Sequence, residues 1–295
     1  MPRTKAEQAI HEAETHLMAG DYQPAREAYR RSRLFFHEAG DGGGEVEALM
    51  GLADVERLLE HDDTARDLLV EARALLAGMG EPLQEAEVLL RLGEVLADCE
   101  KLDEAMQAFA SARDLFDGAD EHEGVAMALL RLGHAAVDAG QDDHGLDHFL
   151  AAQAAARKAE DDESEALALR AMADIERRLG RTDRAHQALD RALALFRQTG
   201  DALDEAATLA ELGTLLRDTG DKAGAIETYH KAAHLFAAAG DLEGEGTTLL
   251  VVARLETDRD PKLAKRHYDH AIELFEREGL GELSALAKDE RARLK

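Results

Sequence analysis

The sequence is poor in the residues that interrupt or cross-link a chain. It has 1 cysteine, 4 prolines and no tryptophan among 295 residues, and aromatic residues make up 4%. A single cysteine excludes an intramolecular disulfide, and few prolines leave long stretches free to form helices. Leucine and alanine, both strong helix formers, supply most of the apolar content. This composition favours a helical protein over a sheet sandwich or a disulfide-rich scaffold.

Long apolar segments are also absent. No stretch approaches 18 uninterrupted apolar residues, so no transmembrane helix is expected. The N-terminus runs directly into a charged helical pattern and carries no apolar signal region. Cys99 stands where equivalent segments carry Leu59, Ala139 and Leu179, and we expect it to be a small buried hydrophobe in a reducing compartment. These features predict a cytoplasmic protein.

Positive charge is scarce. The chain has 62 Asp and Glu against 35 Lys and Arg, which gives a formal net charge of −27. Such a charge repels phosphate backbones and anionic membranes, so neither nucleic acid nor membrane is an expected partner. We interpret the excess acid as a source of solubility for a surface-rich chain. Adaptation of the host to salt is the alternative interpretation.

The chain repeats itself with a period of 40 residues. In the first predicted helix of each copy, helix A, a leucine recurs at Leu49, Leu89, Leu129, Leu169, Leu209 and Leu249. Three residues later comes a second apolar residue, and the next residue is always small: Ala53, Gly93, Gly133, Ala173, Gly213 and Ala253. This spacing predicts one apolar stripe with a flat spot, which allows a neighbouring helix to come close.

A second predicted helix, helix B, repeats as faithfully. It begins with a small residue, and a large one follows four positions later at Tyr29, Leu69, Phe109, Phe149, Leu189 and Tyr229. Further small and large residues follow in steps of three and four, which keeps the whole set on one helical face. Gly40-Asp41, Gly200-Asp201 and Gly240-Asp241 are expected to end one helix and cap the next.

Other turns carry different signals. Asp63, Asp103, Asp143 and Asp183 stand where they are expected to cap helix B, as Asp260 does before Pro261. At Asp120 and at Glu160-Asp161 the glycine is missing, so we expect those turns to close without a residue that adopts the left-handed conformation easily.

We therefore predict an all-α fold of seven antiparallel helical hairpins. Their approximate boundaries are 4–39, 44–79, 83–118, 121–159, 162–199, 202–239 and 242–278. A final helix, about 281–294, is expected to cover the open end of the stack. No linker divides the array, so we predict one continuous domain over 1–295.

The quoted pattern resembles the tetratricopeptide repeat (TPR) family over nearly the whole chain. The period is 40 residues, against about 34 in the common TPR. The long period and the Gly-Asp-x-x-x-Glu linkers, such as Gly200-Asp201 to Glu205, resemble the adaptors with Leu-Gly-Asn repeats and bacterial TPR regulators. The resemblance implies a right-handed α-solenoid that holds a peptide or a partner protein in its concave groove.

Helix A is expected to line that groove. Positions beside the apolar stripe vary from copy to copy, whereas the stripe does not, and we expect the varied positions to specify a ligand. The candidate partner-binding residues are Met50, Asp54, Glu94, Leu130, His134, Arg170, Asp174, Arg177, Thr214, Arg217 and Arg254. Six of these replace the asparagine that often holds a peptide backbone in the Leu-Gly-Asn repeats: Asp54, Glu94, His134, Asp174, Thr214 and Arg254.

Arginines gather in the second half of the chain, at Arg170, Arg177, Arg217 and Arg254. One interpretation is a basic pocket for an acidic segment of a partner, since arginine offers forked hydrogen bonds. The alternative is pairing within a helix, for example of Arg170 with Asp174.

We find no constellation that predicts catalysis, a cofactor or a metal. His144 with His148, His230 with His234, and His267 with His270 have the spacing of metal-binding pairs, but no third ligand is spaced to complete a site. Phosphate loops, dinucleotide fingerprints and catalytic triads are not seen. The prediction is a non-enzymatic adaptor that binds a partner protein or peptide. The alternatives are a peptide-responsive regulatory sensor and a scaffold that assembles with itself.

Overall fold

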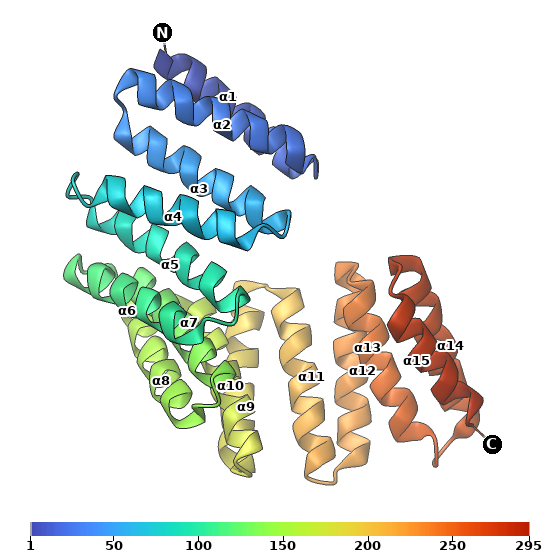
Figure 1. Ribbon diagram of the computed structural model, residues 1–295. Coiled ribbons are helices and arrows are strands. Elements are labelled where there is room, and N and C mark those ends of the chain that lie inside the picture. Colours follow the sequence, from blue (N-terminus) through green and yellow to red (C-terminus); the bar gives the residue numbers. More distant parts are fainter. Residues whose placement is uncertain (1, 295) are drawn as a thin grey trace. The chain divides into compact units, whose positions relative to one another are not determined.

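The computed structural model describes residues 2–294, which form fifteen α-helices and no strand (Figure 1). The chain divides into two compact units, one up to Ala159 and one from Glu160 onward. The helices of the first unit are α1 (Pro2–Met18), α2 (Tyr22–Ala39), α3 (Gly42–Leu58), α4 (Asp62–Leu76), α5 (Pro82–Asp98), α6 (Leu102–Gly118), α7 (His122–Asp138) and α8 (Asp142–Ala159). Those of the second unit are α9 (Asp162–Arg178), α10 (Thr182–Thr199), α11 (Ala202–Asp218), α12 (Lys222–Ala239), α13 (Leu242–Glu256), α14 (Pro261–Glu278) and α15 (Gly281–Ala292).

The helices are the predicted hairpins. Each odd-numbered helix from α1 to α13 is a helix A and packs on the even-numbered helix B that follows it, and α15 is the predicted terminal helix. The all-α solenoid of hairpins is thus confirmed, with boundaries that differ from the prediction by only a few residues. The prediction of one continuous domain stays a prediction, because each unit is compact by itself.

The core is built from the residues that repeat. Phe149, Phe196 and Phe275 of the B helices are almost fully buried. Phe196 clusters with Leu169 of α9, and Phe275 with Leu249 of α13. The predicted flat spot on helix A receives the aromatic ring of helix B. A Cβ atom on Gly93 would lie 2.4 Å from the Phe109 ring. Only glycine permits this approach, because protein interiors are close-packed and leave no room for an added methyl group.

The turns confirm part of the predicted capping. Gly40, Gly200 and Gly240 are left-handed, and the side chains of Asp41, Asp201 and Asp241 each accept a hydrogen bond from a backbone N–H three residues later. Asp260 caps α14 through the N–H groups of Lys262 and Leu263.

The turns without glycine close with Asp120 and Glu160 themselves in the left-handed conformation, with φ of 61° and 57°. Two local predictions were wrong. Asp63, Asp103, Asp143 and Asp183 lie inside the first turn of their helices, where they face the positive end of the helix dipole without being the cap. Cys99 is only half-buried, because it follows the last turn of α5. Among the residues described here, no helix is both long and apolar enough to cross a membrane.

Candidate functional site

The predicted partner-binding residues lie on the A helices. We call the side chains that α3, α5 and α7 present in the first unit, and α9, α11 and α13 in the second, the A-helix surface. Leu130 is 8% exposed and contributes to the core. The other candidates are at least partly exposed. Met50 is half-buried on α3, and the exposed His134 packs edge-on against Phe149 with ring centroids 5.0 Å apart.

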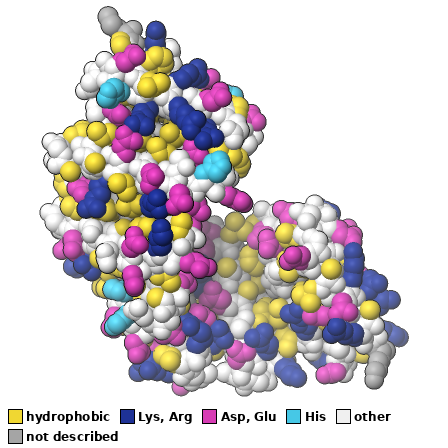
Figure 2. All heavy atoms as spheres, in the orientation of Figure 1, with side chains coloured by type: hydrophobic (Ala, Val, Ile, Leu, Met, Phe, Trp, Pro, Cys, Tyr) yellow, Lys and Arg dark blue, Asp and Glu magenta, His cyan; other side chains and the backbone are white. Residues whose placement is uncertain are grey.

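In the first unit, ion pairs join successive A helices across this surface. The carboxylate of Glu94 on α5 forms ion pairs with Arg57 of α3 at 3.1 Å and with Arg131 of α7 at 3.0 Å. Asp54 on α3 pairs with Arg91 on α5. Figure 2 shows the same mixture of acidic and basic side chains over the visible face of the molecule. Each candidate acid on this part of the surface is therefore already partnered by an arginine of the next helix.

The arginines of the second unit are partnered in the same way. Arg170 of α9 pairs with Asp204, and its Nε lies 3.7 Å from Glu211 of α11. Arg177 lies 2.8 Å from Asp174 and 3.0 Å from Asp218 of α11. These contacts join equivalent faces of neighbouring A helices, so an acidic partner would compete with internal carboxylates for the same guanidinium groups.

The remaining candidates also have internal contacts. Arg217 pairs with the adjacent Asp218 at 2.9 Å, and Arg254 of α13 holds both carboxylate oxygens of Glu290 on α15 at 2.8 Å. Thr214 bonds to the Tyr229 hydroxyl at 2.8 Å. Pairing within a helix accounts for Asp174 with Arg178, at 3.1 Å, but Arg170 pairs with the next A helix instead of with Asp174.

Glu211 lies at the centre of this group of charges. Its neighbours Ala173, Asp174, Arg177, Leu189 and Thr214 enclose with it a small cavity of about 130 Å³. Burial raises the pKa of Glu211 to about 7, while Arg170 opposes the shift and Asp174 adds to it. The charge of this part of the A-helix surface therefore changes near neutral pH.

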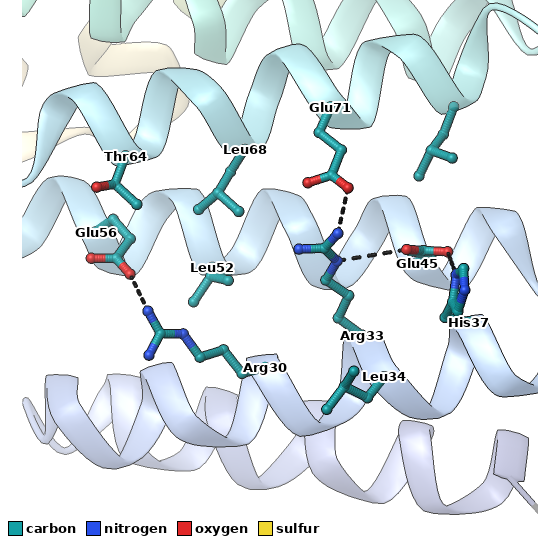
Figure 3. Close-up of a pocket in the computed structure, with 11 residues that line it drawn as sticks. Arg30, Arg33, Leu34, His37, Glu45, Leu52, Glu56, Thr64, Leu68 and Glu71 are labelled. Carbon is teal, nitrogen blue, oxygen red and sulfur yellow. Dashed lines mark hydrogen bonds and ion pairs between the residues drawn. The ribbon is translucent and has the colours of Figure 1, made fainter.

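A larger cavity, of about 700 Å³, lies between α2 and α4 of the first unit, with α3 as its floor (Figure 3). We call it the B-helix furrow. Leu34, 62% exposed, stands at its rim, and Leu52, Leu68 and Leu75 supply further apolar lining. The sequence analysis missed it, although Leu34 gave a signal as a large apolar residue outside the repeated stripe of helix B.

Charges edge the furrow. Arg33 of α2 reaches Glu71 of α4 and lies 3.6 Å from Glu45 of α3, and Figure 3 shows its side chain between the two carboxylates. His37 bonds to Glu45 at 3.0 Å. Apolar side chains beside paired charges are a combination that sites binding a segment of another protein often show.

A family model described as soluble NSF attachment protein, SNAP, matches residues 126–285, which is more than half of the chain. The chain belongs to this family. The SNAP model begins within α7 and ends within α15, so it covers the repeats of the second unit and the end of the first. A search of curated proteins gave no match.

Solved structures share the architecture. The apo form of RapI superposes with a TM-score of 0.70 at 14% identity, covering 94% of this chain and 99% of that one. Aspartyl phosphate phosphatase F from Bacillus subtilis gives 0.69 at 13% identity, over 92% of this chain and 70% of that one. A Rap protein complexed with competence and sporulation factor gives 0.63 at 14% identity, over 99% and 77%. At these identities the similarity establishes a shared TPR-like fold.

Proposed function

We propose that the chain is a scaffold that binds a segment of a partner protein. The observation that carries the proposal is the division between repeated and varied positions. The stripe that builds each hairpin is nearly constant, whereas the A-helix surface changes its side chains from one repeat to the next. Solenoids of this kind present extended binding surfaces, because each repeat adds the same backbone frame with new side chains.

The A-helix surface of the second unit suits an acidic segment. The guanidinium groups of Arg170 and Arg177 on α9 and of Arg217 on α11 each offer several N–H donors, and each is paired with a carboxylate of the chain. A partner's carboxylates would replace internal ones of the same chemistry, which favours specificity over a large gain in affinity. We further propose that the role is non-enzymatic and that the protein is cytoplasmic.

A peptide-responsive sensor is the second candidate function. It is favoured by the shared fold of a Rap protein that was solved with the competence and sporulation factor bound. A sensor differs from a plain scaffold in that its ligand shifts the population of two arrangements of the repeats. Scattering radii measured with and without a bound peptide separate the two functions.

The test is affinity capture from an extract of the source cells with three matched baits. The first bait is the wild type, and the second carries Arg170→Gln, Arg177→Gln and Arg217→Gln. The third bait carries Arg31→Gln, Arg66→Gln and Arg113→Gln, which change the net charge by the same amount at exposed or half-buried arginines on the B helices. We expect the second bait to retain at least tenfold less of the partner than the wild type does. We expect the third bait to retain as much as the wild type.

Two outcomes count against the proposal. Equal retention by all three baits removes the A-helix surface as the binding site, and Leu34→Asp then tests the B-helix furrow. If the wild-type bait retains no protein at all, the proposal that the chain is a binding scaffold is contradicted. Light scattering of the purified chain tests self-assembly. A molar mass that increases with protein concentration would support it, and a constant monomer mass would contradict it.

A further inference from the structure

Three successive helices of the second unit bring metal-binding side chains together. His230 of α12, Glu256 at the end of α13 and His267 of α14 each present one ligand atom, and these atoms all lie within 4.8 Å of one another. Nε2 of His267 is 3.5 Å from Oε2 of Glu256. The two imidazole rings are 5.1 Å apart between centroids and tilted by 52°.

The cluster contains polar atoms without partners. Oε2 of Glu256 and Nε2 of His267 are both buried, and neither has a hydrogen-bond partner among the described residues. Glu256 as a residue is only 4% exposed. Leaving a buried polar atom unsatisfied costs about 1–3 kcal/mol, so each such atom calls for an explanation. Here the two atoms lie 3.5 Å apart.

Equivalent positions in other repeats supply the comparison. The repeat places Glu56 and Glu176 where Glu256 stands, and all three glutamates are buried. The carboxylate of Glu56 forms ion pairs with Arg26 at 2.7 Å and with Arg30 at 3.4 Å. Glu176 lies 3.2 Å from Arg181 and 3.5 Å from Arg184.

At Glu256 no arginine takes this place. His230 occupies the repeat position of Arg30, and His267 is the one basic side chain within ion-pair distance of Glu256 in residues 2–294. Arg259 lies near enough for its charge to act on Glu256, but it makes no ion pair with it among the described residues. The third glutamate therefore lacks the direct arginine ion pair that the other two have.

We propose that His230, Glu256 and His267 bind a Zn²⁺ ion. Two imidazole nitrogens and one carboxylate oxygen are a ligand set that zinc takes in proteins, with a fourth position open to water. Tetrahedral zinc at its usual bond lengths separates its ligand atoms by about 3.3 Å. The 3.5 Å between His267 Nε2 and Glu256 Oε2 is close to that value. The ligand atom of His230 lies within 4.8 Å of both, and a small rotation of its side chain would shorten these distances.

The chemistry of each ligand agrees with this assignment. Zinc supplies the missing positive charge to Glu256 and occupies the acceptor lone pair of the His267 nitrogen. Imidazole nitrogens and carboxylate oxygens are both ligand types that zinc prefers. Since the three ligands come from α12, α13 and α14, the ion joins two adjacent hairpins.

The experiment uses the full-length, untagged chain, stripped with a chelator and titrated with zinc chloride in a calorimeter. We expect one equivalent to bind saturably. Glu256→Gln removes the carboxylate without changing the size of the side chain, and we expect it to weaken zinc binding at least 30-fold. The matched controls are His234→Ala and His144→Ala, which lie outside the cluster, and we expect their affinity to stay within twofold of the wild type.

A second readout keeps the test decisive if a variant folds poorly. Cobalt in place of zinc gives visible absorption typical of four-coordinate geometry, and we expect it in the wild type and in both histidine controls. His267→Gln is expected to lose the absorption. The proposal is overturned if zinc binding is not saturable, or if its affinity is unchanged in Glu256→Gln. It is also overturned if His144→Ala loses the binding to the same extent as Glu256→Gln.

Discussion

Glu56 and Glu256 occupy the same place in two repeats, yet their surroundings differ. Around Glu56 lie two arginines and His61, whose Nδ1 is 2.9 Å from the carboxylate. Around Glu256 lie two histidines. In other repeats the position is simply apolar, as Leu96 and Leu216. The scaffold thus does not need an acid there, and a buried acid is retained only with a group that compensates its charge.

The largest expected effect comes from removing a cation at Glu56. Arg26→Met keeps the length and apolar stem of the side chain but leaves Glu56 with Arg30 and His61 alone. We expect the free energy of unfolding to fall by about 3 kcal/mol, because losing one partner of a buried ion pair leaves charge uncompensated. Urea unfolding followed by circular dichroism measures it. A fall below about 0.5 kcal/mol, the range of an ordinary surface substitution, would contradict the importance of that pair.

Removing the charge of Glu256 itself should raise the stability of the metal-free protein. Burial raises the pKa of Glu256, which means that the folded state disfavours its ionised form. Glu256→Gln is therefore expected to raise the free energy of unfolding by about 1 kcal/mol at pH 8 with a chelator present. Glu56→Gln, the matched variant, is expected to lower it. Equal signs for the two variants would remove the contrast between the sites.

Glu211 sharpens the comparison, since it is an acid with arginines nearby that still titrates near neutrality. Its pKa in the folded chain is raised to about 7 from 4.5. The folded state thus holds this proton more tightly, so its contribution to stability is present below pH 4.5 and is lost as the pH rises through about 7.

Replacement by glutamine should remove that loss. Glu211→Gln is expected to be more stable than the wild type at pH 8 by about 1 kcal/mol, an amount reduced by solvent screening, and to match it at pH 4.5. Unfolding of both proteins at the two pH values gives the difference. A stability gap that stays constant with pH would show that Glu211 does not titrate in this range.

The hairpins could be predicted because each is a local object. The recurrence of Leu49 and its equivalents, the small residues of helix A and the large residues of helix B fix two amphipathic helices in every 40 residues. Where the prediction failed, as for the capping role of Asp63, the start of the helix was misplaced by one or two residues. Asp120 takes a left-handed conformation at a cost of about 1–2 kcal/mol, which the rest of the repeat tolerates.

The candidate sites were harder to predict, because their contacts cross between helices. Arg57 reaches Glu94 and Asp98 over 37 and 41 residues, which a search along one helix does not find. The metal-binding cluster shows the same limit. His230 was paired with His234 and His267 with His270 by spacing, whereas the fold places His230 and His267 together with a glutamate from a third helix. Only the packing register of α12, α13 and α14 reveals that arrangement.

The most direct test of the contrast is thermal unfolding of the wild type, Glu56→Gln and Glu256→Gln, each with a chelator and with excess zinc. Because zinc binds the folded chain, it should raise the Tm of the wild type and of Glu56→Gln by several degrees. It should leave Glu256→Gln unchanged. An equal rise in all three proteins would contradict the assignment of the ion to Glu256 and its two histidines.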